Sequence, residues 1–108
     1  MGDERTIVAV MRRLEDKDFL VRGEASRALQ ELAEKGDKRT IAAVMKRLED
    51  KDSRVREAAV CVLCALAEKG DERTLAAVMQ RLEDKDFLVR GEALRALQEL
   101  AEKGDERT

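Results

Sequence analysis

Apolar residues in the first third of the chain recur every three or four positions, in two segments separated by a polar turn, "EDKD" at 15–18. This spacing places them on one side of an α-helix in each segment, with charged residues on the other side. Asp3 and Asp18 stand directly before the two segments, where an aspartate can cap a helix N-terminus. Gly36 follows the second segment, at a position that favours a left-handed backbone. The pattern predicts two amphipathic helices, whose apolar stripes are Ile7, Val10, Met11 and Leu14 in the first and Val21, Ala25, Ala28, Leu29 and Leu32 in the second.

The same two-helix pattern occurs three times with a period of 34 residues. "GDERT" at 2–6 returns as "GDKRT" at 36–40 and as "GDERT" at 70–74 and 104–108. A pair of helices with one apolar stripe each cannot bury a core alone, but stacked pairs can. We therefore expect an all-α fold, an α-solenoid (α-α superhelix) of helix-turn-helix units, within a single repeat domain, 1–108. The units are 2–35, 36–69 and 70–103, and residues 104–108 begin a fourth unit.

Charged residues make up 43% of the chain and hydrophobic residues 44%, and the net charge is −2. Acids and bases in near-equal number are typical of helices with paired surface charges, and they create no overall field that would attract nucleic acid. No apolar run is long enough to span a membrane, and the polar N-terminus lacks the pattern of a secretory signal. We expect a cytoplasmic location, because the two cysteines form no disulfide framework.

The chain contains no histidine. It therefore lacks the commonest acid–base catalyst and the commonest metal ligand, and a serine–histidine or cysteine–histidine nucleophile is impossible. Its six glycines lie at helix junctions or singly within the second helices, so no phosphate-binding loop is expected. We expect neither enzymatic activity nor a cofactor.

The turn and the second helix of each unit carry a family pattern. The segments 14–29 ("LEDKDFLVRGEASRAL"), 48–63 ("LEDKDSRVREAAVCVL") and 82–97 ("LEDKDFLVRGEALRAL") each combine turn aspartates, a Val–Arg pair and an alanine-rich helix. The chain thereby resembles the HEAT-like repeat family, of the phycobilin-lyase type, over all three units. The resemblance implies a scaffold whose second helices bind other proteins. The iron chemistry of the similar deoxyhypusine hydroxylases needs histidines and cannot carry over.

The resemblance also implies ion pairs that tie the turns together, between an arginine early in each second helix and an aspartate of the preceding turn. The alternative is ordinary surface pairing between residues four apart, worth about 0.3–0.5 kcal/mol. The implied pairs are Arg22 with Asp18, Arg56 with Asp52, and Arg90 with Asp86.

The second helix of the middle unit differs from its two counterparts on the side opposite its apolar stripe. On a helical wheel, that side carries Ala58, Cys61, Cys64 and Ala65. The corresponding residues of unit one are polar or charged: Glu24, Arg27, Gln30 and Glu31. Because an exposed apolar patch usually contacts a partner, we expect the four residues of the middle unit to form a protein-interaction patch.

Several uses of this patch remain open. It can pair with its own copy in a second chain, bind a different protein, or pack beneath a neighbouring unit as filler. Cys61 and Cys64 can also link two chains through a shared metal or through oxidation, as a metal- or redox-linked oligomerisation module. An RNA-binding solenoid is a further alternative, although the middle unit offers no aromatic residue for base stacking. Its basic residues are Lys46, Arg47, Lys51, Arg54 and Arg56.

Two further expectations concern the packing of units. The outer units begin their second helices with Phe19 and Leu20 and with Phe87 and Leu88, which we expect to form a tight joint between units; the alternative is a partner-binding ridge. Units one and three are identical at 30 of 34 positions, so neither end carries a polar capping unit. We therefore expect uncapped ends that stack head to tail or pair, in a segment of a longer array or in an engineered repeat protein.

Overall fold

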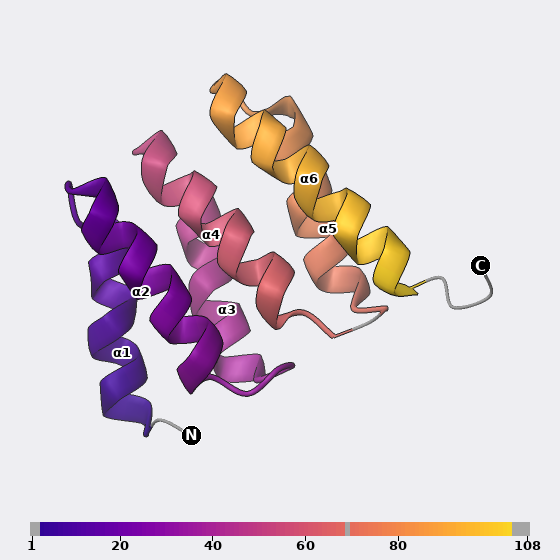
Figure 1. Cartoon of the computed structure of the whole chain (residues 1–108). Coiled ribbons are helices and arrows are strands. Elements are labelled where there is room, and N and C mark those ends of the chain that lie inside the picture. The colour runs from indigo at the N-terminus through magenta and orange to yellow at the C-terminus, as the bar shows by residue number, and fades with distance from the viewer. Residues whose placement is uncertain (1–2, 69, 105–108) are drawn as a thin grey trace.

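The computed structural model describes residues 3–68 and 70–104, with side chains as far as residue 101, and within these residues it contains helices and no strand (Figure 1). Gly2, predicted to mark the first junction, and residues 105–108 of the expected fourth unit lie outside the described residues. The α-helices form three consecutive pairs, and a 3-10 helix extends the first helix of each pair. In chain order the elements are α1 (Glu4–Arg12), η1 (Arg13–Glu15), α2 (Phe19–Leu32), α3 (Lys38–Lys46), η2 (Arg47–Glu49), α4 (Ser53–Leu66), α5 (Glu72–Gln80), η3 (Arg81–Glu83) and α6 (Phe87–Gly104).

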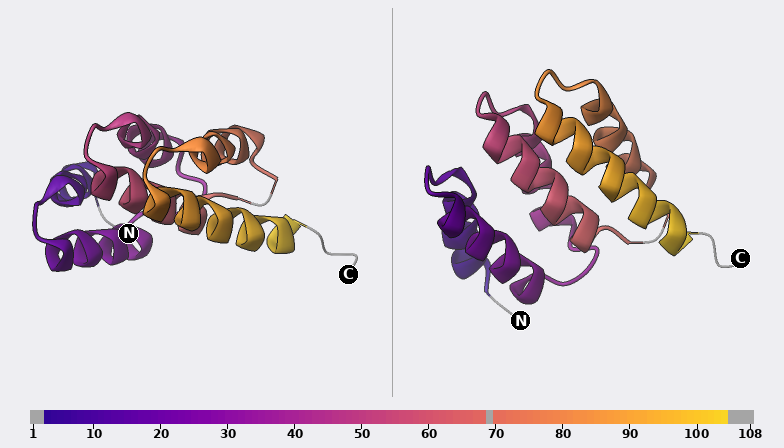
Figure 2. Two further views of the ribbon diagram at one scale, coloured as in Figure 1. Left: turned by 90° about the horizontal axis from the view of Figure 1, so that it is seen from above. Right: turned by 45° about the horizontal axis from the view of Figure 1, so that its top comes forward.

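The helices are arranged in two rows. The second helices α2, α4 and α6 lie side by side in one row, and the first helices α1, α3 and α5 form the other (Figures 1 and 2). Each first helix packs on the second helix of its own unit, and α4 packs on both α2 and α6. Neighbouring first helices contact each other far less than neighbouring second helices do. The predicted all-α solenoid of helix pairs is confirmed.

Aspartates determine where the helices begin. Asp3 Oδ1 accepts a hydrogen bond from the Thr6 amide at 2.8 Å, and Asp18 Oδ1 accepts one from the Leu20 amide at 2.9 Å. These bonds satisfy amide groups that have no carbonyl partner inside the helix. The two predicted N-caps are confirmed. Later helices are capped in the same way by Asp37, Asp52 and Asp71.

Glycines form the junctions between units. Gly36 and Gly70 have positive φ angles of 82° and 80°, a conformation that is unfavourable for residues with a Cβ atom. The Gly36 amide also donates a hydrogen bond of 2.8 Å to the Leu66 carbonyl, so the junction after unit one is fastened to the end of α4. The left-handed backbone predicted at Gly36 is confirmed.

A continuous apolar core runs between the two rows through all three units. In unit one, Ala25 and Leu29 of the predicted second-helix stripe are buried, whereas Val21, Ala28 and Leu32 are half-buried. In the middle unit, which has a neighbour on each side, all five residues equivalent to that stripe are buried. These residues are Val55, Ala59, Val62, Leu63 and Leu66. Burial therefore depends on the stacking of units as well as on the pairing of helices.

The predicted apolar joint between units is wrong. Phe19 and Phe87 are 69% and 70% exposed, and Leu20 and Leu88 are also exposed. These residues occupy the first turn of α2 and of α6, directly after the capping aspartate. Their side chains are left largely exposed instead of packing between units.

Candidate protein-interaction surface

The middle second helix, α4, lies between α2 and α6 (Figure 1). Ala58, Cys61 and Ala65 are half-buried, whereas Cys64 is only 3% exposed. The expectation that all four residues face outward is therefore wrong for Cys64. A helical wheel considers one helix alone, and it could not show that α6 covers this position. We refer to Ala58, Cys61 and Ala65 as the α4 strip.

The two thiols contact opposite neighbours of α4. The Ser26 hydroxyl on α2 is placed to donate to Cys61 Sγ at 3.9 Å. Cys64 Sγ lies 3.8 Å from the Ala96 carbonyl and 3.5 Å from Glu99 Oε1, both on α6. The small side chain of Cys64 thus allows α6 to approach α4 closely, which the longer glutamine at the same position of the outer units would not.

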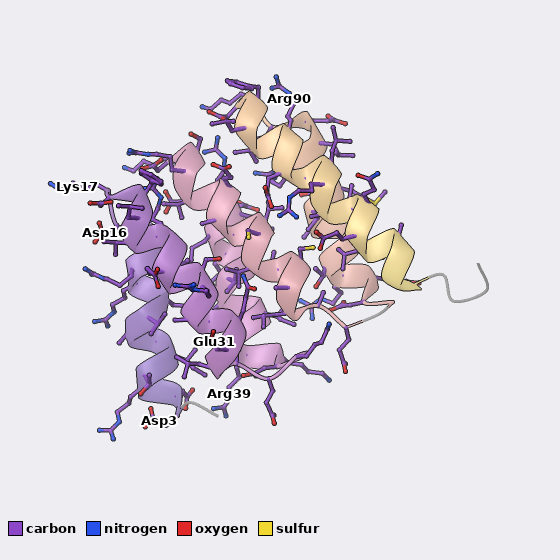
Figure 3. All side chains as sticks on the ribbon, in the orientation of Figure 1. Asp3, Asp16, Lys17, Glu31, Arg39 and Arg90 are labelled. Carbon is purple, nitrogen blue, oxygen red and sulfur yellow. The ribbon has the colours of Figure 1, made fainter. Side chains whose placement is uncertain are left out.

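Paired charges border the α4 strip on both sides. On α2, Arg27 Nη2 lies 2.6 Å from Glu24 Oε2. On α6, Arg95 pairs with Glu92, and its Nη1 lies 2.7 Å from Glu99 Oε2. Figure 3 shows these helices with their side chains. An apolar centre with a charged rim is the usual composition of a protein-binding surface.

The titratable groups on α4 disfavour nucleophilic and metal-binding chemistry. Burial, and then the charge of Glu92, raise the pKa of the Cys61 thiol, which disfavours the thiolate that binds metals and attacks electrophiles. Burial, and then the charges of Glu92 and Asp86, raise the pKa of Glu57. The described residues contain no group of three or more His, Cys, Asp or Glu side chains placed to hold a metal ion. The arrangement is suited to contact with another molecule.

The turn arginines bind backbone carbonyls. Arg22 Nη1 donates to the Asp16 carbonyl at 2.7 Å, and the same bond recurs with the same length in the other two turns. The carboxylate of Asp18 instead caps α2 through the Leu20 amide. Among the described residues, the structure therefore corrects three expected ion pairs: Arg22–Asp18, Arg56–Asp52 and Arg90–Asp86.

One turn arginine also forms an ion pair between units. Arg56 Nε and Nη2 lie 2.8 Å and 2.9 Å from the two carboxylate oxygens of Asp84, and the side chains are only 6% and 3% exposed. Arg56 holds the pKa of Asp84 below its ordinary value. This pair could not be predicted from the sequence, because a repeat period does not reveal which residues of successive units face each other.

The row of first helices offers a second, more open surface. A hollow of about 370 Å³ lies between α3 and α5, lined in part by Ile41, Met45 and Arg73. A hollow of about 330 Å³ lies between α1 and α3, lined in part by Ile7 and Val8. These hollows exist because neighbouring first helices make few contacts, and they provide a surface with which the second-helix face can be compared.

The family model described as "Sister chromatid cohesion protein PDS5 protein" matches residues 4–103, nearly the whole chain and all three helix pairs. The chain belongs to the PDS5 family. It is a HEAT-like repeat protein of a non-catalytic scaffold family, and its members act through protein–protein interactions. No curated protein matches the chain in sequence. No described helix is long and apolar enough to cross a membrane.

Proposed function

We propose that this PDS5-family chain is a non-enzymatic scaffold that binds another protein through its second-helix face, centred on the α4 strip. The observation that carries the proposal is the replacement of a charged triad by Ala58, Cys61 and Ala65, on the helix that lies at the centre of the row. Glu92, Arg95 and Glu99 occupy the corresponding positions in unit three. Three coordinated changes on one helix face favour a selected contact.

The composition of the face indicates what kind of partner fits. The α4 strip is apolar and half-exposed, and charges of both signs flank it on α2 and α6. A partner helix or strand with small apolar residues at its centre and charged residues at its edges would match this surface. Cys64 contributes indirectly, because it sets the distance between α4 and α6.

Two alternatives receive less support. A metal shared between chains through Cys61 and Cys64 requires both sulfur atoms at the surface, and Cys64 is buried. A disulfide between chains would use Cys61, whose raised pKa disfavours the reactive thiolate. An RNA-binding solenoid requires unpaired cations on the middle unit. Three of its basic residues already have acidic partners, namely Arg47 with Glu15, Arg54 with Asp52, and Arg56 with Asp84.

The proposal also covers the type of HEAT-like repeat and the cellular compartment of the protein. The turn, Val–Arg pair and alanine-rich helix support repeats of the phycobilin-lyase type within the HEAT-like class. Two cysteines without a disulfide framework in the sequence support a reducing compartment, and we propose the cytoplasm. The family's role in sister chromatid cohesion makes the nucleus the alternative, which fractionation of the tagged protein would distinguish.

Site-specific photo-crosslinking tests the proposed surface. A photoreactive residue replaces Arg27, which is exposed on α2 next to the α4 strip, or Ala76, which is exposed on α5 in the row of first helices. We expect a protein partner to be crosslinked from position 27 and not from position 76. Crosslinking of the same partner from position 76 alone would place binding on the first helices and contradict the proposal.

A further inference from the structure

Equivalent residues of the repeat are covered inside the stack and exposed at its ends. Leu94, on α6, is 61% exposed, whereas Val60, its equivalent on α4, is fully buried. Met79 on α5 is exposed, although Met11 at the same repeat position is buried. Thr6 at the other end is exposed. Its equivalents Thr40 and Thr74 are both buried. The last unit therefore presents the side that units one and two bury, and the first unit presents the side that units two and three bury.

The polar contacts between units two and three also join two different surfaces, one on each unit. We call the side of a unit that packs on the next unit its trailing side, and the side that packs on the preceding unit its leading side. Arg56, on the trailing side of unit two, donates to Asp84 on the leading side of unit three. On that same leading side, Arg81 Nη1 donates to the Leu48 carbonyl of unit two at 2.7 Å. The interface between units two and three thus combines an arginine on one side with an aspartate and a second arginine on the other, whereas between units one and two Arg47 pairs with Glu15.

Both halves of this contact remain at the ends of the stack. The repeat places Arg90 where unit two has Arg56, and it places Asp16 and Arg13 where unit three has Asp84 and Arg81. Figure 3 shows Asp16 and Arg90 at opposite ends of the row of second helices. Arg90 and Arg13 are exposed, and the Arg13 side chain pairs only weakly, at 3.4 Å, with Asp16.

We propose that a second copy of this chain docks its first unit on the third unit of the first copy, continuing the stack head to tail. In this contact Arg90 of one copy binds Asp16 of the next, as Arg56 binds Asp84 within the chain. Leu94 and Met79 are covered at the same time. Unit one matches this role because it is identical to unit three, which already docks on unit two, at 30 of 34 positions.

The proposed contact joins two different surfaces, so it does not close on itself. A heterologous contact of this kind produces open chains whose length grows with concentration. It is independent of the proposed binding through the α4 strip, because the end surfaces and the strip share no residue. Association of copies and binding of a partner can therefore be tested separately.

Two blocked variants test the proposal. One carries Arg90→Glu and Leu94→Glu on the trailing side, and the other carries Thr6→Arg and Arg13→Glu on the leading side. All four side chains are exposed, so both variants should fold, which circular dichroism would check. Leu88→Glu is the matched control, because Leu88 is exposed on α6 but its equivalents Leu20 and Arg54 are exposed inside the stack as well.

Light scattering from micromolar to millimolar concentration measures the molecular mass of each protein in solution. We expect the mass of the natural protein and of Leu88→Glu to rise steadily above 12.2 kDa, and each blocked variant to stay at that mass. An equimolar mixture of the two blocked variants should double in mass and grow no further, because one intact surface of each kind remains. A natural protein that stays monomeric, or a mixture that does not double, would overturn the proposal. If the trailing-side variant is unfolded, Leu94→Ser, the residue of unit one, replaces it with the same criterion.

Discussion

Arg56 and Asp84 form the polar contact that is most deeply buried between two units. An arginine with two parallel bonds to a carboxylate holds a fixed geometry, and the pair therefore sets how unit three sits on unit two. Its contribution to stability is measured by removing Arg56, because the buried carboxylate of Asp84 then keeps a single, longer contact with Arg81.

Arg56→Met should lower the free energy of unfolding by up to roughly 3–5 kcal/mol, because the buried Asp84 then keeps one cationic partner, Arg81, at the longer distance of 3.5 Å. Urea denaturation would measure the loss. Arg54→Met is the control, since Arg54 pairs with Asp52 at the surface and its removal should change little. The natural protein should also lose the contribution of the pair below about pH 4, because Asp84 has a lowered pKa and its carboxylate must be ionised to pair. Equal losses in the two variants would contradict the assignment.

Glu57 has a raised pKa, in contrast to Asp84, so its ionisation has the opposite effect on stability. Its pKa is raised from 4.5 by burial and by neighbouring carboxylates, so ionisation disfavours the folded state as the pH rises through that value. Glu57→Gln should therefore increase the stability at neutral pH, and this gain should vanish in acid, where Glu57 is protonated. Glu24→Gln should instead lower the stability at neutral pH, because Arg27 lowers the pKa of Glu24 and so favours its ionised form in the folded state. Thermal unfolding over a pH series would decide, and a gain from Glu57→Gln that persists in acid would contradict the electrostatic cause.

The two cysteines should differ in reactivity. Cys64 is buried against α6, so we expect it to react with iodoacetamide only when the protein opens. Cys61 is partly exposed, and it should react first, although more slowly than an unburied thiol because its pKa is raised. Mass spectrometry of the labelled peptide would locate the first modification. Faster labelling of Cys64 than of Cys61 would contradict the covering of α4 by α6.

Glycines at junctions and glycines within helices have opposite roles at the scale of elements. Gly36→Ala should lower the stability by about 1–2 kcal/mol, because φ there is positive. Gly23→Ala should raise it by about 0.5–1 kcal/mol, because Gly23 lies inside α2, and a Cβ atom would meet nothing within 4 Å. Gly70→Ala distinguishes backbone strain from a steric clash. The φ angle of Gly70 is also positive, but a Cβ there would meet nothing within 4 Å, whereas a Cβ at position 36 would approach Glu68. Urea denaturation would measure all three variants, and a stabilising Gly36→Ala would contradict the account.

The helices and their ends could be predicted because their signals are local. Asp3, Asp18 and Gly36 act on backbone groups within a few residues, and the apolar spacing identifies the buried side of each helix. The burial of Cys64 could not be predicted in the same way, because it depends on how closely α6 approaches α4. The exposure of Phe19 could not be predicted either, because it depends on which side of α2 the neighbouring helices cover.

At the scale of the whole molecule, stacking decides which surfaces remain for partners. The period of 34 residues predicts that units stack, and the PDS5 match supports a protein-binding scaffold, but neither locates the binding face. The geometry favours the row of α2, α4 and α6, where packed helices form a continuous surface with an apolar centre. The first helices are more separated, and open hollows lie between them.

Isothermal titration of the crosslinked partner, once purified, against the natural protein and one triple variant tests the central claim most directly. The variant carries Ala58→Glu, Cys61→Arg and Ala65→Glu, the residues that unit three has at these positions, and all three sites are half-exposed. We predict that the variant unfolds at a similar temperature and that its affinity falls at least about tenfold, or about 1.4 kcal/mol. Unchanged affinity in a folded variant would contradict the claim that the α4 strip is the centre of the binding surface.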